Sequence, residues 1–218
     1  MIGQLAAKYP GTVWDTIPAG LFNYGGGGIY SGGAVCGGYN GAMAVLRQMG
    51  APAAVAQNYH RWFENTYLPT NAAYVDMASG SWTPAAGWSA YPATTAVTRL
   101  LNNAPKVKPM TTTCHGSHTR WKTAANTWLQ AKGVTANNDR CGKLTYDCAF
   151  KLATLINQWK AGATIDGTLD PTTGATAAGC KQSNCHASTA GGYPESGVGG
   201  FMKCTPCHTQ RIGDGHNL

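Results

Sequence analysis

The sequence has few charged residues. Asp, Glu, Lys and Arg make up 11% of its 218 residues, against roughly 25% in an ordinary globular protein. Such a surface has little like-charge repulsion to keep copies of the chain apart, so self-association is expected. The chain does contain seven Trp and ten Tyr, and this aromatic content excludes disorder driven by charge.

Clusters of basic residues and long apolar runs are also missing. The formal net charge is +7, but Lys and Arg are scattered singly, whereas a nucleic-acid-binding surface gathers them in a patch. We therefore expect no nucleic-acid partner. No stretch approaches the ~18 apolar residues of a membrane span, and the N-terminal residues show no charged segment followed by an apolar one, as a leader would.

No strand pattern and no fixed-period repeat is persuasive, because the apolar residues recur at helical spacing. The predicted helices span residues 35–49, 53–67, 95–102, 119–132 and 139–160. A long packed loop is predicted over 68–92, and after Gly162 the periodicity disappears. The sequence therefore predicts a mainly α fold, with a helical, cysteine-containing domain over 1–162 and a loop-rich segment over 163–218. That segment has too few apolar side chains to fold around itself, and a large apolar cofactor would supply what is missing.

The loop-rich segment carries a motif of covalent haem attachment. Cys204-Thr205-Pro206-Cys207-His208 has the form C-x-x-C-H, in which two thiols bind one edge of the porphyrin and the following His is the proximal iron ligand. Upstream, Cys180 and the pair Cys185-His186 form a longer variant, with four residues between the cysteines. We therefore predict two haems c, bound by Cys180, Cys185, His186, Cys204, Cys207 and His208.

Zinc is the alternative occupant of the same cysteines. Gaps of four and two residues between paired cysteines also suit a zinc ribbon, which would make the chain an interaction module. Zinc gives no role to His186 or His208, whereas haem needs both. Haem is therefore the favoured interpretation.

An electron-carrying haem usually has a second axial ligand on its iron. The candidates are the remaining histidines, His60, His115, His118 and His216. We expect His115 and His118 in a short loop before a helix, where they can reach two neighbouring irons. His216 can serve its own chain or a neighbour. His60 lies on a predicted helix, where a position at the edge of the core, bonded to a backbone carbonyl, is favoured over iron ligation.

These features predict electron transfer and no enzymatic activity. Only 21 residues separate His186 from His208, so the haems are expected to lie close together and to exchange electrons rapidly. The carrier is expected to be periplasmic or extracellular, with its leader removed, and to exchange electrons with redox partner proteins or extracellular acceptors. It is expected to form a dimer or an extracellular conductive filament. The alternative is a small cytochrome reductase with an open haem site.

The upstream cysteines are Cys36, Cys114, Cys141 and Cys148. Cys141 and Cys148 are seven residues apart on one predicted helix, or about 10.5 Å along its axis, whereas a disulfide needs Cα atoms within ~7 Å. In an oxidising compartment, Cys36 and Cys114 are therefore expected to form disulfides with Cys141 and Cys148, in either combination. The alternatives are that these cysteines hold an iron–sulfur cluster or that they are free thiols.

The pattern as a whole is similar to a known family. The matching pieces are the two haem motifs, the ending Gly213-Asp214-Gly215-His216, and the segment from Ala34 to Ala42 with the three later cysteines. This segment resembles a C-GCAxxG-C-C domain, although Cys36-Gly37-Gly38 departs from the Gly-Cys-Ala order. The chain thereby resembles the split-Soret cytochromes c. The resemblance implies two stacked haems, each with two His ligands, at one end of a mainly helical subunit, and a dimer that brings haem pairs together.

Overall fold

The structure is a computed structural model, which describes residues 6–7, 9–18, 24–79, 103–132 and 138–168. The described helices are α2 (Val13–Thr16), α3 (Gly37–Gln48), α4 (Ala53–Asn65), α5 (Ala72–Ala78), α7 (Cys114–Ala131) and α8 (Asn138–Lys160). The β-structure of this part is limited to isolated bridges, between Val35 and Thr113 and between Leu68 and Val107. The predicted mainly α fold is confirmed. The predicted helix over 95–102 and the segment 169–218 lie outside the described residues.

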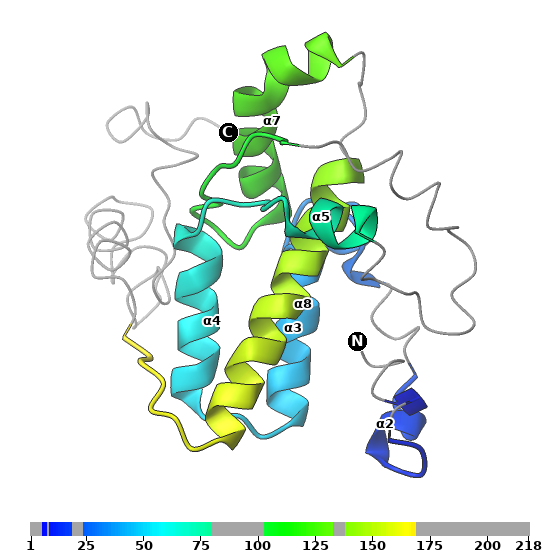
Figure 1. Ribbon diagram of the computed structural model, residues 1–218, viewed down its shortest axis with the longest axis vertical. Helices are drawn as coiled ribbons and strands as arrows, with labels where there is room; N and C mark the ends of the chain where they lie inside the picture. Colours follow the sequence, from blue (N-terminus) through cyan, green and yellow to red (C-terminus); the bar gives the residue numbers. More distant parts are fainter. Residues whose placement is uncertain (1–5, 8, 19–23, 80–102, 133–137, 169–218) are drawn as a thin grey trace, which may run out of the picture.

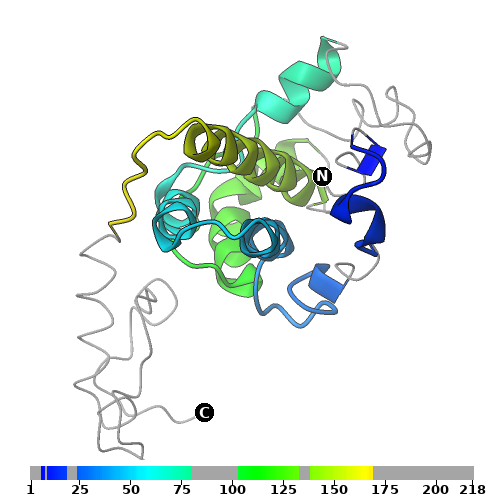
Figure 2. The same ribbon diagram turned by 90° about the horizontal axis from the view of Figure 1, so that it is seen from below.

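Helices α3, α4 and α8 lie side by side and form the main body of the molecule (Figure 1, Figure 2). Helices α3 and α8 begin at the same end of this body, and α4 runs in the opposite direction (Figure 1). The side chains buried between them are mainly apolar and include Val45, Leu46, Val55, Tyr59, Phe63, Leu144, Leu152 and Leu155. They recur every three or four residues, so each helix has one apolar face that must be covered by its neighbours.

Helix α7 begins earlier than the sequence predicts, at Cys114 and not near Thr119. The N–H groups of its first turn have no partner within the helix and need acceptors elsewhere. The N–H of Cys114 donates to the carbonyl of Ala34, and that of His115 donates to the carbonyl of Gly33 at 2.8 Å. The preceding loop therefore allows the helix to begin at Cys114, a feature that the periodicity of apolar residues does not contain.

The predicted long loop over 68–92 contains a short helix, α5, in the part that the structure describes. Just before it, the N–H of Thr70 donates to Asp147 of α8 at 2.6 Å, and the Thr70 hydroxyl donates to the same carboxylate. This contact ties the loop to the main body and places α5 against α8. The prediction of an uninterrupted loop was wrong because it did not include this tertiary contact.

Helix α8 ends as predicted, with Gly162 in the left-handed conformation (φ 79°) just after its last turn. The chain then turns back and runs along α4 as far as Thr168. Gly167 lies so close to α4 that a Cβ atom there would be 2.5 Å from the Cα of Ala54. Residues beyond the predicted domain boundary at 162 therefore still pack on the helical body.

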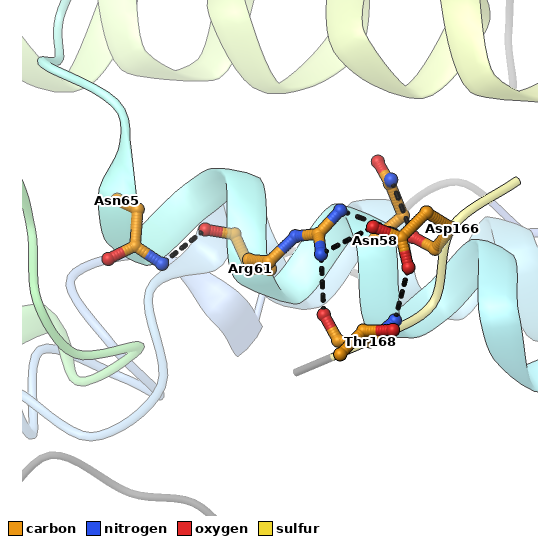
Figure 3. A network of polar contacts seen from close by, with 5 residues as sticks. All are labelled: Asn58, Arg61, Asn65, Asp166 and Thr168. Carbon is orange, nitrogen blue, oxygen red and sulfur yellow. Dashed lines mark hydrogen bonds and ion pairs between the residues drawn. The ribbon is translucent and has the colours of Figure 1, made fainter. Parts of the chain in front are cut away.

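Polar side chains of α4 hold this segment (Figure 3). Nη1 of Arg61 donates to Oδ2 of Asp166 at 2.8 Å and to the carbonyl of Thr168 at 2.6 Å. Nδ2 of Asn58 donates to the carbonyl of Asp166 at 2.8 Å. The chain therefore leaves the described part of the structure beside α4.

Candidate functional site: a cysteine pocket

Three helices begin around one pocket, and each brings a cysteine to it. Cys36 immediately precedes α3, Cys114 is the first residue of α7, and Cys141 lies in the first turn of α8. These cysteines line a pocket of about 360 Å³, together with Arg140 and the glycines at 25–27 and 37–38. The thiol groups, which are far apart in the sequence, therefore share one enclosed space.

The glycine-rich loop can approach these helix ends because it lacks side chains. A Cβ atom on Gly37 would be 2.5 Å from the carbonyl oxygen of Gly25, and one on Gly28 would be 2.6 Å from Cβ of Cys114. Gly28 also has a φ of 76°, a backbone conformation that residues with a Cβ atom rarely adopt. The sequence predicts a loop at Gly25-Gly26-Gly27-Gly28, and the structure adds that this loop is one wall of the pocket.

Backbone pairing brings the first two cysteines together. The N–H of Cys36 donates to the carbonyl of Thr112 at 2.8 Å, and Val35 forms a β-bridge with Thr113. Because Cys114 follows Thr113 directly, the start of α7 is fixed beside the start of α3. This pairing is not visible in the pattern of apolar residues.

Cys148 lies beside the pocket and is deeply buried. Its side chain is 1% exposed, and its Sγ lies 3.3 Å from the position that a Cβ on Gly38 would take. The hydroxyl of Tyr59 donates to its backbone carbonyl at 3.3 Å. The fourth upstream cysteine is therefore adjacent to the other three, behind the wall formed by α3.

The predicted disulfides are absent from the structure, in which Cys36, Cys114, Cys141 and Cys148 are all free thiols. The first three face an open pocket, and Cys148 lies outside the lining of that pocket. The disulfide prediction is therefore corrected. The prediction assumed that cysteines in an oxidising compartment link helices through disulfides. The fold instead places three of them around one pocket and the fourth beside it.

Burial and one cation act on these thiols in opposite directions. Burial raises the pKa of Cys36, and the N–H groups of Tyr39 and Gly38 lower it again. Burial also raises the pKa of Cys114 and of Cys148. Arg140 lowers the pKa of all three. The guanidinium is thus close enough to favour negative charge in and around the pocket.

Arg140 is a functional candidate that the sequence analysis missed. Its side chain lines the pocket and is only 2% exposed. Its Nε–H finds no hydrogen-bond partner among the described residues, although a buried donor without a partner is costly. Charged residues are normally on the surface, so composition and periodicity offered no signal for this one.

The pocket suits an occupant larger than a single ion. The described residues contain no group of three or more His, Cys, Asp or Glu that could hold one metal ion. The thiols instead surround a space of about 360 Å³. Thiolates are the ligands of iron–sulfur centres, and a buried guanidinium compensates negative charge. The donor set therefore fits an anionic iron–thiolate centre that spans the pocket.

His60 lies at the edge of the core, as favoured from the sequence, but side chains hold it and not a backbone carbonyl. Its Nδ1 lies 2.8 Å from Oη of Tyr39, and its Nε2 lies 3.6 Å from Oε2 of Glu64. Both ring nitrogens therefore already have partners. An iron ligand at this position would have to give up one of them.

His115 and His118 lie in the first two turns of α7, so the prediction that they belong to a loop was wrong. Three residues apart on a helix, they lie on neighbouring parts of its surface. His115 is exposed, and His118 is half-buried. Burial lowers the pKa of His118, with Arg140, Lys122 and His115 adding to the effect. A neutral imidazole is the form that binds a metal. His216 and the predicted haem ligands Cys180, Cys185, His186, Cys204, Cys207 and His208 lie outside the described residues.

Comparisons by sequence and by structure both find a split-Soret cytochrome c. The split-Soret cytochrome c of Desulfovibrio desulfuricans is 26% identical to this chain over 214 residues, which cover 96% of the chain. The chain is thus similar to a split-Soret cytochrome c along nearly its whole length. It spans 66% of the length of that protein.

A solved structure of the split-Soret cytochrome c from Desulfovibrio desulfuricans, described for its novel iron centre, has the same fold. Its TM-score is 0.62 at 25% identity, over 99% of this chain and 81% of the other. No protein-family profile matches the chain. In the part that the structure describes, no helix combines the length and apolar character needed to cross a membrane. The relationship to split-Soret cytochromes supports a haem cytochrome.

Proposed function

We propose that the chain is an electron-transfer cytochrome that carries two haems c in residues 163–218. The observation that carries this proposal is the similarity to a split-Soret cytochrome c over 96% of the chain, which includes the two Cys-His motifs of the tail. Thioether bonds from Cys180, Cys185, Cys204 and Cys207 would hold the porphyrins. The haems supply the one-electron chemistry, and the protein binds, orients and insulates them.

His186 and His208 would be the proximal ligands, and other histidines would complete the coordination. His115 and His118, in the first two turns of α7, are the favoured candidates among the described residues, because both ring nitrogens of His60 already have partners. His216 is the further candidate in the tail. With both axial positions filled, the irons carry electrons and bind no substrate, which is why we favour electron transfer over a reductase.

The carrier would work outside the cytoplasm, because covalent haem attachment and removal of a leader belong to that route. Its low content of charged residues, 11%, favours assembly of copies into a dimer or a conductive filament. Redox partner proteins or extracellular acceptors would take the electrons. Electron microscopy of native material separates the two assemblies: particles of fixed size indicate the dimer, and fibres indicate the filament.

The proximal ligands can be tested by substitution of single histidines. H186A and H208A should each convert one haem from low spin to high spin, with the other haem unchanged in its absorption spectrum. H60Q is the matched control, because His60 is held by Tyr39 and Glu64 and should leave both haems low spin. Unchanged spectra in both H186A and H208A would refute the ligands proposed. Prompt, complete carbon monoxide binding by the reduced wild type would favour the reductase.

A second proposal concerns the cysteine pocket, where a specific observation favours an iron centre. Three thiols line one pocket, a fourth lies beside it, and Arg140 faces them from within the same lining. Cys36, Cys114 and Cys141 would hold the centre from the pocket lining, with Cys148 buried beside them, and the centre would add a one-electron couple to those of the haems. The test is the ratio of total iron to haem, together with a thiol count under denaturing conditions without reductant. Iron in excess of haem supports the centre, and iron equal to haem contradicts it.

A further inference from the structure

The cysteine pocket is positively polarised by its backbone. The N-termini of α3, α7 and α8 converge on it, and each helix N-terminus carries the equivalent of roughly half a positive charge. Thr113, the N-cap residue of α7, makes no side-chain hydrogen bond to the helix. The three helix ends therefore favour a negatively charged occupant.

Arg140 adds a full positive charge to the same space. Its side chain is 2% exposed, and its Nε–H has no hydrogen-bond partner in the described part of the chain. No Asp or Glu occurs among the described residues that line the pocket. Asp147, on the same helix, accepts hydrogen bonds from Thr70. A buried cation of this kind needs an anionic partner, because its desolvation is costly.

A second buried cation lies near Arg140 on the same helix. Lys143, one turn further along α8, is completely buried, and it has a partner of its own. The pocket thus combines thiol donors, helix N-termini and a buried guanidinium without a carboxylate in its lining.

We infer that Arg140 is a positioning and charge-compensating residue for an anionic iron–thiolate centre in this pocket. The inference rests on the proposed iron centre and adds a role for a residue that is not itself a ligand. Thiolates bound to iron give such a centre a net negative charge, and each electron added makes it more negative. The guanidinium therefore stabilises the bound centre and favours its reduced form over its oxidised form. Its buried Nε–H is the donor available to the occupant or to a thiolate.

The test compares R140Q and R140K with wild type in the complete, haem-loaded protein. R47Q is the matched control, because Arg47 is an exposed arginine in the last turn of α3, outside the pocket. Two quantities are measured: the rate at which a chelator removes non-haem iron, and the reduction potential of the non-haem centre in an EPR-monitored titration. Low-spin haem spectra and circular dichroism show that each variant is folded.

R140Q should lose non-haem iron at least about tenfold faster than wild type, since removing one partner of a buried charge pair is strongly destabilising. Its centre should also have a lower reduction potential, whereas the haem potentials should stay nearly unchanged. R140K keeps the charge and should lie between R140Q and wild type, and R47Q should match wild type. If R140Q fails to fold, R140K still tests the role of the charge: a rate of iron loss within twofold of wild type, with an unchanged reduction potential, supports it.

Three results would overturn the inference, and they differ in what they say about the pocket. Equal iron retention and equal potential in folded R140Q and wild type would remove the role of Arg140 and leave the iron centre in place. Wild-type protein without iron beyond its haem would remove the iron centre together with the inference. R140K that loses iron tenfold faster than wild type and has a lowered potential would show that shape, and not charge, is decisive, and would also overturn it.

Discussion

The hydroxyl of Tyr39 on α3 lies 2.8 Å from Nδ1 of His60 on α4. Nε2 of the same ring faces the carboxylate of Glu64, at 3.6 Å, so both ring nitrogens of His60 lie beside polar partners. Burial and the nearby charge of Glu64 raise the pKa of Tyr39 to about 12. The phenol therefore stays a hydrogen-bond donor at every physiological pH, and His60 is fixed as part of the helical body.

Loss of this contact should lower the stability of the protein and leave the haem spectra unchanged. Y39F removes one partly buried hydrogen bond, which should lower the free energy of unfolding by about 0.5–1.5 kcal/mol. Denaturant unfolding measures this change. The low-spin haem spectrum should be the same as that of wild type. High-spin haem in Y39F or in H60Q would mean that His60 serves an iron.

A pair of glycine substitutions on α3 tests the tight wall of the pocket. G37A would place a Cβ atom 2.5 Å from the carbonyl oxygen of Gly25, so the glycine-rich loop must move away and the pocket must change shape. G41A is the control on the same helix, because no atom lies within 4 Å of its Cβ position. G37A should lower the melting temperature and the content of non-haem iron. G41A should be neutral or stabilise by about 0.5–1 kcal/mol. Equal behaviour of both variants would contradict the packing described.

The segment after α8 should be released from α4 by acid. Hydrogen bonds from the backbone of Thr168 and from Arg61 lower the pKa of Asp166 from an ordinary 3.8 to about 2. The ionised carboxylate therefore supports the contact fully above pH 3.8, and this support declines as the pH falls towards 2. Proteolysis of D166N at neutral pH measures the same loss without acid. Cleavage after residue 162 should be several times faster in D166N than in wild type, and in D15N, which changes an exposed Asp of α2, it should be unchanged. Equal cleavage of all three proteins would show that the contact does not hold the segment.

The core of the helical body should respond strongly to truncation. L152A removes a side chain that is 1% exposed and should lower the free energy of unfolding by about 2–5 kcal/mol. F150S changes a side chain on the same helix that is 65% exposed and should alter stability by less than about 1 kcal/mol. Thermal or denaturant unfolding compares them. A loss of stability in F150S as large as that in L152A would show that the outer face of α8 is also packed.

The sequence predicted the helices best where the apolar pattern is long. Helices α3, α4 and α8 follow it within a few residues, because their apolar faces are buried against one another. The start of α7 and the presence of α5 depend on hydrogen bonds to distant residues, such as Gly33 and Asp147, and a local pattern cannot contain these.

The sequence predicted only part of the candidate site. The four upstream cysteines were identified as a set, and disulfides, a cluster and free thiols were the three interpretations. The preferred interpretation, disulfides, was wrong for the structure because the fold places three thiols around a common pocket. Arg140 was missed because its burial follows from the convergence of three helix ends, and nothing in the neighbouring residues indicates that convergence. The haem motifs in the tail remain a prediction from residue types and spacing.

Covalent attachment of two haems to the tail is the central claim, and the intact mass of the protein under denaturing conditions tests it most directly. The account predicts a mass equal to the polypeptide plus two haems. In C207A, one haem should remain fully attached, and the other should be held by a single thioether bond. Replacement of both Cys204 and Cys207 should leave one haem. A wild-type mass equal to that of the bare polypeptide, or colour that acid–acetone extraction removes completely, would contradict the claim.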